Sequence, residues 1–183
     1  MNAAEFDTEG KLDGKDTSDA IDQYLTFIMA DEEYGVDILT VKEIRIWDSA
    51  TPIPKAPDHV RGVINLRGTI VPIIDLRQCF SMPAIEYGPE TVVLVLQIET
   101  ETGHREVGIV VDAVSDVYTL DPGQVKPSPD MGSKVNTAYI KGLAKIEEKM
   151  VILLDMSKLL SQEDFSGLAD AQQTIRDTAS LAE

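Results

Sequence analysis

The sequence has one cysteine, Cys79, and no long apolar run. A single thiol cannot form an internal disulfide, and together with an acidic amino terminus that has no export signal it favours the cytoplasm. The longest apolar run, around Val92–Leu96, is too short to span a bilayer. Cys79 has no catalytic signature beside it, so we expect a half-buried structural residue.

Basic residues are also scarce. The chain has 16 Lys and Arg against 32 Asp and Glu, which gives a net charge of −16. Such a protein repels phosphate backbones and anionic lipid surfaces, so nucleic-acid and membrane binding are disfavoured. Both ends are especially acidic, and we expect residues 1–19 to form a flexible acidic tail and residues 162–183 a helical tail.

Motifs for catalysis and cofactors are missing as well. The two histidines, His59 and His104, lie far apart without a metal-ligand pattern, and no nucleophile elbow or phosphate-binding loop occurs. We therefore expect no metal, no cofactor and no enzyme. An acidic hydrolase using Asp37 with Asp112, or Asp75 with Asp155, is the competing hypothesis. Aspartates that flank strands more often accept hydrogen bonds from turn amides.

Short apolar runs separated by turn residues predict an all-β protein. Runs at 24–29 and 34–38 read as strands, and the strands on either side of Arg67-Gly68-Thr69 read as a hairpin. Val41–Ile44 suggests one helical turn, residues 52–57 form a proline-rich loop, and Pro72 suggests an edge strand or a bulge. Arg67 at the hairpin either snorkels from the edge of the core or anchors a polar partner.

The sequence repeats itself. Residues 34–44 align with 107–117, 60–63 with 140–143, and 73–76 with 153–156. Gly62 and Asp75 are 13 residues apart, as are Gly142 and Asp155. We therefore predict two similar halves, about 23–84 and 85–160, each with about five short strands. Small barrels that share an apolar interface are the first choice and a β-sandwich is the second.

The run from Arg61 to Arg77, RGVINLRGTIVPIIDLR, resembles the hallmark of CheW-type chemotaxis coupling proteins. The segments 33–38, 41–45 and 108–117 are similar to the two other hairpins of this family. The resemblance covers about Gln23 to Leu160, and it places a CheW-like domain at 20–161. It implies two SH3-like five-stranded β-barrel lobes around a shared hydrophobic core, with short helices.

This resemblance also implies a function. Members are non-enzymatic scaffolds that bind the regulatory domain of the chemotaxis histidine kinase and the cytoplasmic tips of methyl-accepting chemoreceptors. They work in the cytoplasm and are recruited to receptor arrays at the inner membrane. A coupling module of a related sensory pathway, such as surface motility, is the alternative.

Site residues follow from the resemblance position by position. The receptor-binding groove is expected to contain Val41, Arg67, Val92, Val114 and Val117. The kinase-binding surface is expected to contain Ile38, Glu43, Gly62 and Gly142. Several of these valines also suit barrel interiors, and the two glycines also suit purely backbone requirements.

Overall fold

The computed structural model describes residues 22–101, 103–129 and 137–160, and these form eleven strands with short helical turns. The predicted tails at 1–19 and 162–183 lie outside the described residues. The all-β prediction is confirmed. In chain order the elements are β1 (Asp22–Met29), β2 (Glu32–Asp37), η2 (Ile38–Thr40), β3 (Val41–Ile46), β4 (Val60–Leu66), β5 (Thr69–Asp75), α1 (Leu76–Cys79), β6 (Val92–Thr100), β7 (Gly103–Val111), β8 (Ala113–Leu120), η3 (Pro122–Gln124), β9 (Val125–Lys126), β10 (Ile140–Ile146), β11 (Lys149–Leu154) and α2 (Met156–Leu160).

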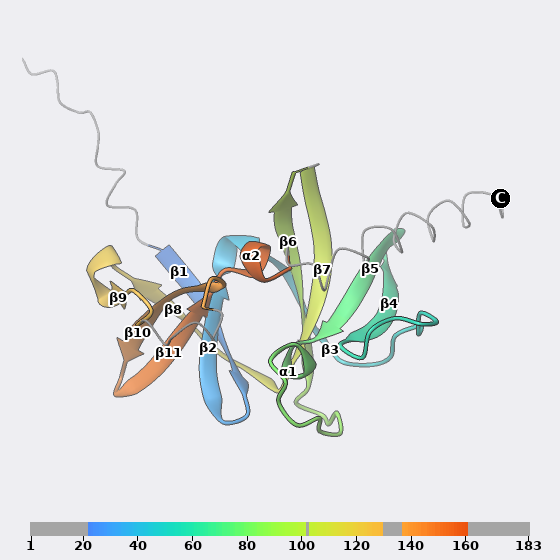
Figure 1. Ribbon diagram of the computed structural model, residues 1–183, viewed down its shortest axis with the longest axis horizontal. Coiled ribbons are helices and arrows are strands. Elements are labelled where there is room, and N and C mark those ends of the chain that lie inside the picture. Colours follow the sequence, from blue (N-terminus) through green and yellow to red (C-terminus); the bar gives the residue numbers. More distant parts are fainter. Residues whose placement is uncertain (1–21, 102, 130–136, 161–183) are drawn as a thin grey trace, which may run out of the picture.

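The strands form two sheets that lie side by side (Figure 1). The six-stranded lobe has the order β8-β1-β2-β11-β10-β9, and the five-stranded lobe has the order β3-β6-β7-β5-β4. Five strands were expected in each lobe, and the six-stranded lobe gains the two-residue strand β9 at its edge. Among the described residues no ladder joins the edge strands, so neither sheet closes into a hydrogen-bonded barrel.

In the five-stranded lobe, two other contacts reach across the open side between β3 and β4. Thr51, in the connection between these strands, forms an isolated bridge with Val63 of β4. Glu43 of β3 pairs with Arg67 in the β4–β5 turn. The sheet therefore curls toward closure without a continuous ladder.

Each predicted half contributes to both sheets. The hairpin β1–β2 belongs to the first half but pairs with β8 and β11 of the second. The hairpin β6–β7 belongs to the second half but pairs with β3 and β5 of the first. Exchanging the two hairpins links the halves by backbone hydrogen bonds, so the lobes interlock.

The two parallel junctions have the same register. Gly35 of β2 lies opposite Leu153 of β11, and Gly108 of β7 lies opposite Ile73 of β5. A Cβ atom on Gly35 would lie 2.9 Å from Leu153 Cδ2, and one on Gly108 would lie 2.6 Å from Ile73 Cδ1. Each junction therefore needs a glycine because the facing side chain already fills the space.

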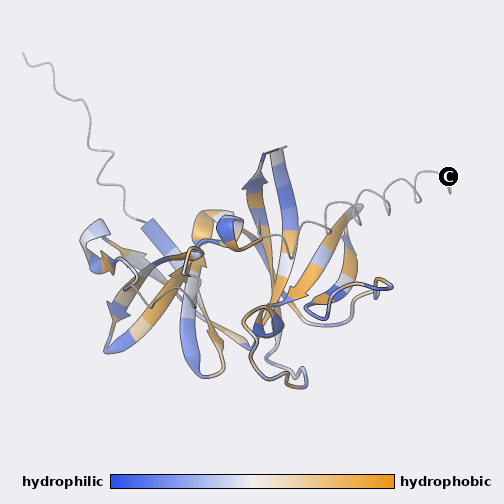
Figure 2. Ribbon diagram, in the orientation of Figure 1, coloured by the Kyte–Doolittle hydropathy of each residue, from blue (hydrophilic) through white to orange (hydrophobic). Residues whose placement is uncertain are grey.

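Both faces of the central strands are buried. On β6, Val93 and Val95 pack inside the five-stranded lobe, whereas Leu94 and Leu96 face a core shared by the two lobes. Figure 2 shows apolar residues along these strands and hydrophilic residues at the free end of the β6–β7 hairpin. Burial on both faces explains why the sequence shows continuous apolar runs instead of a strict alternation.

One local prediction was wrong and a second was only partly right. Val41–Ile44 is part of strand β3, and the helical turn is the preceding η2. There the Leu39 amide donates to Asp37 Oδ1 at 2.9 Å, which caps η2. Pro72 lies in an inner strand of the sheet, but the β7 ladder begins one residue later, at Ile73. The proline therefore occupies a point where β5 has only β4 as its ladder partner.

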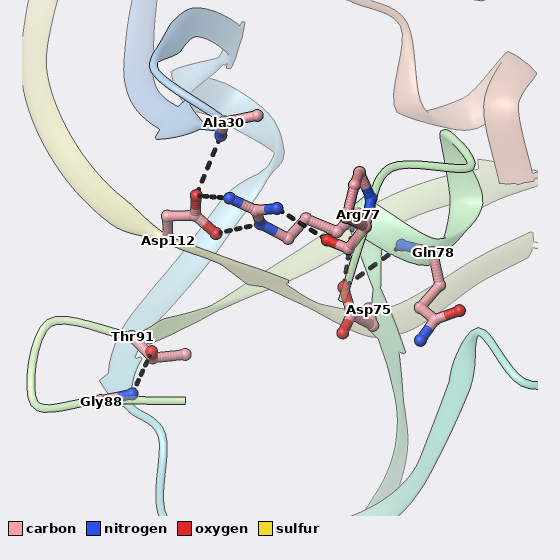
Figure 3. Close-up of polar contacts among 8 residues, drawn as sticks. Ala30, Asp75, Arg77, Gln78, Gly88, Thr91 and Asp112 are labelled. Carbon is pink, nitrogen blue, oxygen red and sulfur yellow. Dashed lines mark hydrogen bonds and ion pairs between the residues drawn. The ribbon is translucent and has the colours of Figure 1, made fainter. Parts of the chain in front are cut away.

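An ion pair fastens the lobes together (Figure 3). Arg77 of α1 donates from Nε and Nη2 to the two carboxylate oxygens of Asp112, each at 2.8 Å. Asp112 lies between β7 and β8, and its Oδ2 also accepts from the Ala30 amide in the β1–β2 turn at 2.9 Å. We call Arg77, Asp112 and Ala30 the interlobe clamp. It joins the end of the five-stranded sheet to a turn of the six-stranded one.

The clamp is mostly buried, with side-chain exposures of 12% for Arg77 and 21% for Asp112. The hydrogen bonds from Arg77 outweigh the effect of burial and hold the pKa of Asp112 below its ordinary value. The same hydrogen bonds raise the pKa of Arg77. Bidentate charged pairs of this kind are stronger than neutral hydrogen bonds.

Replacing Asp112 with Asn should make the stability of the protein less dependent on acid pH. The pKa of Asp112 is lower in the folded than in the unfolded protein, so the ionised carboxylate stabilises the fold. This stabilisation is complete above the unfolded pKa of about 3.9 and is lost as the pH falls through the folded pKa. We expect Asp112→Asn to cost about 2 kcal/mol at neutral pH. The cost should shrink below about pH 4. Urea unfolding at several pH values measures this difference.

Asp48→Asn, at an exposed position outside the clamp, is the control and should leave stability unchanged within about 0.5 kcal/mol. A cost for Asp112→Asn that stays the same from neutral to strongly acid pH would contradict an electrostatic role for the clamp.

Candidate docking surfaces

A charged cluster connects strand β3 to the β4–β5 turn. Glu43 accepts from Arg45 Nη1 at 2.9 Å through Oε1 and from Arg67 Nη1 at 3.1 Å through Oε2. Arg67 has φ of 52° and Gly68 has φ of 90°, so two left-handed residues form this tight hairpin turn. We call Glu43, Arg45 and Arg67 the charged cluster. It brings together Arg67, expected at the receptor groove, and Glu43, expected at the kinase surface.

The cluster is available to a partner. The Arg67 side chain is 78% exposed although it is paired with Glu43. Hydrogen bonds from Arg45 and then Arg67 lower the pKa of Glu43. An exposed ion pair contributes little to folding, so the fold does not depend on this charged cluster.

Apolar side chains are exposed next to the charged cluster. Leu39 in η2 is 89% exposed, and Ile44 and Ile46 on β3 are 48% and 75% exposed. Ile44 and Ile46 project from the face of β3 opposite to Glu43, because successive side chains of a strand alternate. We call Leu39, Ile44 and Ile46 the apolar edge. Sequence reasoning missed it because the exposure of an apolar residue depends on the tertiary structure around it.

The predicted groove residues are not equivalent. Val41, Val92 and Val114 are half buried and pack against the core shared by the lobes. Val117 on β8 is 44% exposed. Val41 is the first residue of edge strand β3, and Val114 is the second residue of edge strand β8. The two correspond in the repeat, and they lie opposite buried residues of the exchanged hairpins, Leu96 and Phe27. These valines therefore border the seam between the lobes.

The predicted kinase-binding residues fall into two kinds. Ile38 is half buried and Glu43 belongs to the charged cluster, so both border the surface. Gly62 and Gly142 are buried at β-bulges of β4 and β10. A Cβ atom would lie 2.2 Å from the Thr51 carbonyl oxygen at Gly62 and 2.5 Å from Val125 Cγ1 at Gly142. These glycines can act on a partner only through the backbone that they shape.

The four aspartates of the hydrolase hypothesis have structural partners. Asp37 caps η2, and Asp155 accepts from the Lys158 amide at 3.0 Å in α2. Asp75 caps α1 and accepts from the Tyr87 hydroxyl at 2.6 Å, while Asp112 pairs with Arg77. Figure 3 shows Asp112 turned toward Arg77, and Asp75 turned toward the backbone amides of Arg77 and Gln78 in α1. The turn and capping interpretation therefore accounts for all four.

Two interlocked β lobes with a charged cluster and an apolar edge define a protein-docking module. Comparison with known proteins gives the family. A model of the CheW-like domain matches residues 23–164. The Klebsiella aerogenes chemotaxis protein CheW is 48% identical over 144 residues, which cover 79% of this chain and 84% of that protein. The Rhizobium meliloti chemotaxis protein CheW is 37% identical over 142 residues, 78% of this chain and 89% of that protein.

A solved structure agrees. The crystal structure of the scaffolding protein TtCheW from Thermoanaerobacter tengcongensis superposes with a TM-score of 0.70 at 31% identity, covering 79% of this chain and 95% of that one. The chain belongs to the CheW-like family. It is a non-enzymatic scaffold that couples chemoreceptors to their kinase in chemotaxis signalling. In the described ranges, no helix is long and apolar enough to cross a membrane.

Gly62→Ala should act mainly through folding. Gly62 has φ of 138°, which an alanine avoids, and the added methyl would meet the Thr51 carbonyl oxygen. We expect a loss of about 3 kcal/mol or more in the free energy of unfolding, measured by urea denaturation.

Gly68→Ala is the matched control, because Gly68 also has a positive φ but no atom within 4 Å of its added Cβ. It should lose only about 1–2 kcal/mol. Equal losses for the two variants would show that the close approach to Thr51 is unimportant.

Proposed function

We propose that this scaffold joins the cytoplasmic tips of methyl-accepting chemoreceptors to the regulatory domain of the chemotaxis histidine kinase. The receptor site includes Val41, Arg67, Val92, Val114 and Val117, and the kinase site includes Ile38 and Glu43. Gly62 and Gly142 support the kinase site by shaping the backbone. The protein works in the cytoplasm, at receptor arrays on the inner membrane.

The contact between Glu43 and Arg67 carries this proposal. The two residues were assigned to different partners, yet their side chains are 3.1 Å apart. A partner that pulls either side chain away also releases the other, so the two docking sites share one ion pair. Each partner then affects how the other binds, which is the property that a coupling protein requires.

The apolar edge supplies the binding energy that the charged cluster lacks. Leu39 lies in η2, just before β3, and Ile44 and Ile46 lie on the face of β3 opposite to Glu43, where all three are exposed. Exposed apolar residues near a charged rim are typical of protein interfaces. We assign this edge to the kinase, because Ile38 and Glu43 adjoin it.

Arg67→Ala should weaken receptor-dependent activation of the kinase several-fold in a reconstituted mixture of receptor, kinase and scaffold. Arg67 is exposed, so the variant should keep its stability within about 0.5 kcal/mol. Lys145→Ala is the control, since Lys145 is also an exposed cation in an ion pair, with Glu148.

If the Arg67→Ala variant supports normal kinase activation, Arg67 is not part of the receptor site. If the unmodified scaffold leaves the kinase unaffected, the alternative, a coupling module of a related sensory pathway such as surface motility, replaces the proposed one.

Leu39→Ser should weaken binding to the isolated kinase regulatory domain by at least about tenfold, equivalent to about 1.4 kcal/mol. A leucine that is 89% exposed contributes little to folding, so unfolding should not change. Titration calorimetry measures the affinity. Ile85→Ser, at an exposed apolar position outside the apolar edge, should bind normally, and an equal loss in both variants would contradict the assignment.

A further inference from the structure

A second surface feature lies at the other lobe, away from the charged cluster. The β1–β2 turn and the start of β11 enclose a pocket of about 380 Å³, lined by Ile28, Asp31, Glu32, Glu33, Lys149 and Met150. Strands β2 and β11 are side by side here, with Glu33 opposite Val151. The pocket therefore lies where β2 and β11 are joined by the hydrogen bonds of their parallel ladder.

Glu33 is unusual among the residues that line this pocket. It is only 8% exposed, yet its Oε1 has no hydrogen-bond partner. Its Oε2 faces Lys149 Nζ at 3.8 Å, which is an ion-pair distance but too long for a hydrogen bond. A buried carboxylate oxygen without a donor is costly, so a donor from another molecule that reaches this carboxylate would relieve that cost.

The pocket has the chemistry of a site for an organic cation. Asp31, Glu32 and Glu33 carry three negative charges against one positive charge on Lys149. Burial, and next the charges of Glu147 and Glu33, raise the pKa of the nearby Tyr118, which indicates a negative potential at this end of the sheet. In the described residues no group of three or more side chains is arranged to hold a metal ion. Ile28 and Met150 add apolar walls, and Met150 is 54% exposed.

We propose that this pocket binds an arginine side chain presented by a partner protein. The guanidinium donates to the carboxylate of Glu33, and the aliphatic stem lies against Ile28 and Met150. Arginine suits the site better than lysine, because its planar fork carries several donors and its stem packs on apolar surface. None of the residues that line this pocket belongs to the proposed receptor or kinase site, so the proposal does not depend on those sites.

The test uses a blocked tripeptide with a central arginine and the full-length protein labelled at isoleucine and methionine methyl groups. We expect saturable shifts of the Ile28 and Met150 methyl signals, with a dissociation constant on the order of 1 mM. The same tripeptide with citrulline, which is neutral and nearly the same shape, should cause no saturable shift. Equal shifts from both peptides, or none from the arginine peptide, would overturn the proposal.

Two variants with opposite expected effects keep the result independent of folding defects. Glu33→Gln should weaken arginine binding at least tenfold, because it replaces the buried anion with a neutral group. Lys149→Gln should strengthen binding, because it removes the competing cation.

Glu148→Gln is the matched control. It loses the same charge on the neighbouring β10–β11 turn, at a side chain that is 91% exposed and does not line the pocket. If Glu148→Gln weakens binding as much as Glu33→Gln, the peptide responds only to overall charge and the proposed pocket is wrong.

Discussion

Strands that lie between two lobes must bury side chains on both of their faces, and this requirement organises the molecule. The exchanged hairpins β1–β2 and β6–β7 meet it by placing one set of residues inside a lobe and the alternate set in the shared core. Neither half can retain its sheet alone, since each sheet would lose a hairpin and its parallel junction. The interlobe clamp adds a directed contact to this non-directional apolar packing, so it fixes how the lobes are oriented while the core supplies most of the stability.

The proposed docking surfaces follow from the same arrangement. The exchanged hairpins occupy inner positions in the two sheets, so β3 and β8 remain as edge strands on either side of the seam. The valines near the start of these edge strands, Val41 and Val114, are half buried for this reason, and residues farther along, such as Ile44 and Val117, are exposed. An exposed edge with apolar residues invites unwanted pairing. Here the charged cluster on the opposite face of β3 limits such pairing and favours a partner with matching charge.

Local sequence patterns predicted the strands and turns of this fold, but they did not predict which strands pair across the two halves. The turn at Arg67-Gly68 and the repeat of Gly62 and Asp75 in Gly142 and Asp155 are visible in the sequence because turns and bulges need particular residues. The exchange of hairpins leaves no local signal, since a strand has the same pattern whichever half it pairs with. Within the candidate site, resemblance supplied Glu43 and Arg67 but not their contact. Leu39 escaped notice because exposure depends on what covers a residue, which only the tertiary structure decides.

A shared ion pair makes sense of a scaffold without catalytic groups. To couple two partners, a protein must change its affinity for one when the other binds, and a rigid, doubly buried core leaves little freedom for large movements. Side chains at the surface keep that freedom: Glu43 holds Arg45 and Arg67 at hydrogen-bond distance at the same time, one through each carboxylate oxygen. Releasing Arg67 while keeping Arg45 needs no change in the sheets. In the proposed function, coupling therefore resides in this small electrostatic switch, and the interlocked lobes keep its parts in register.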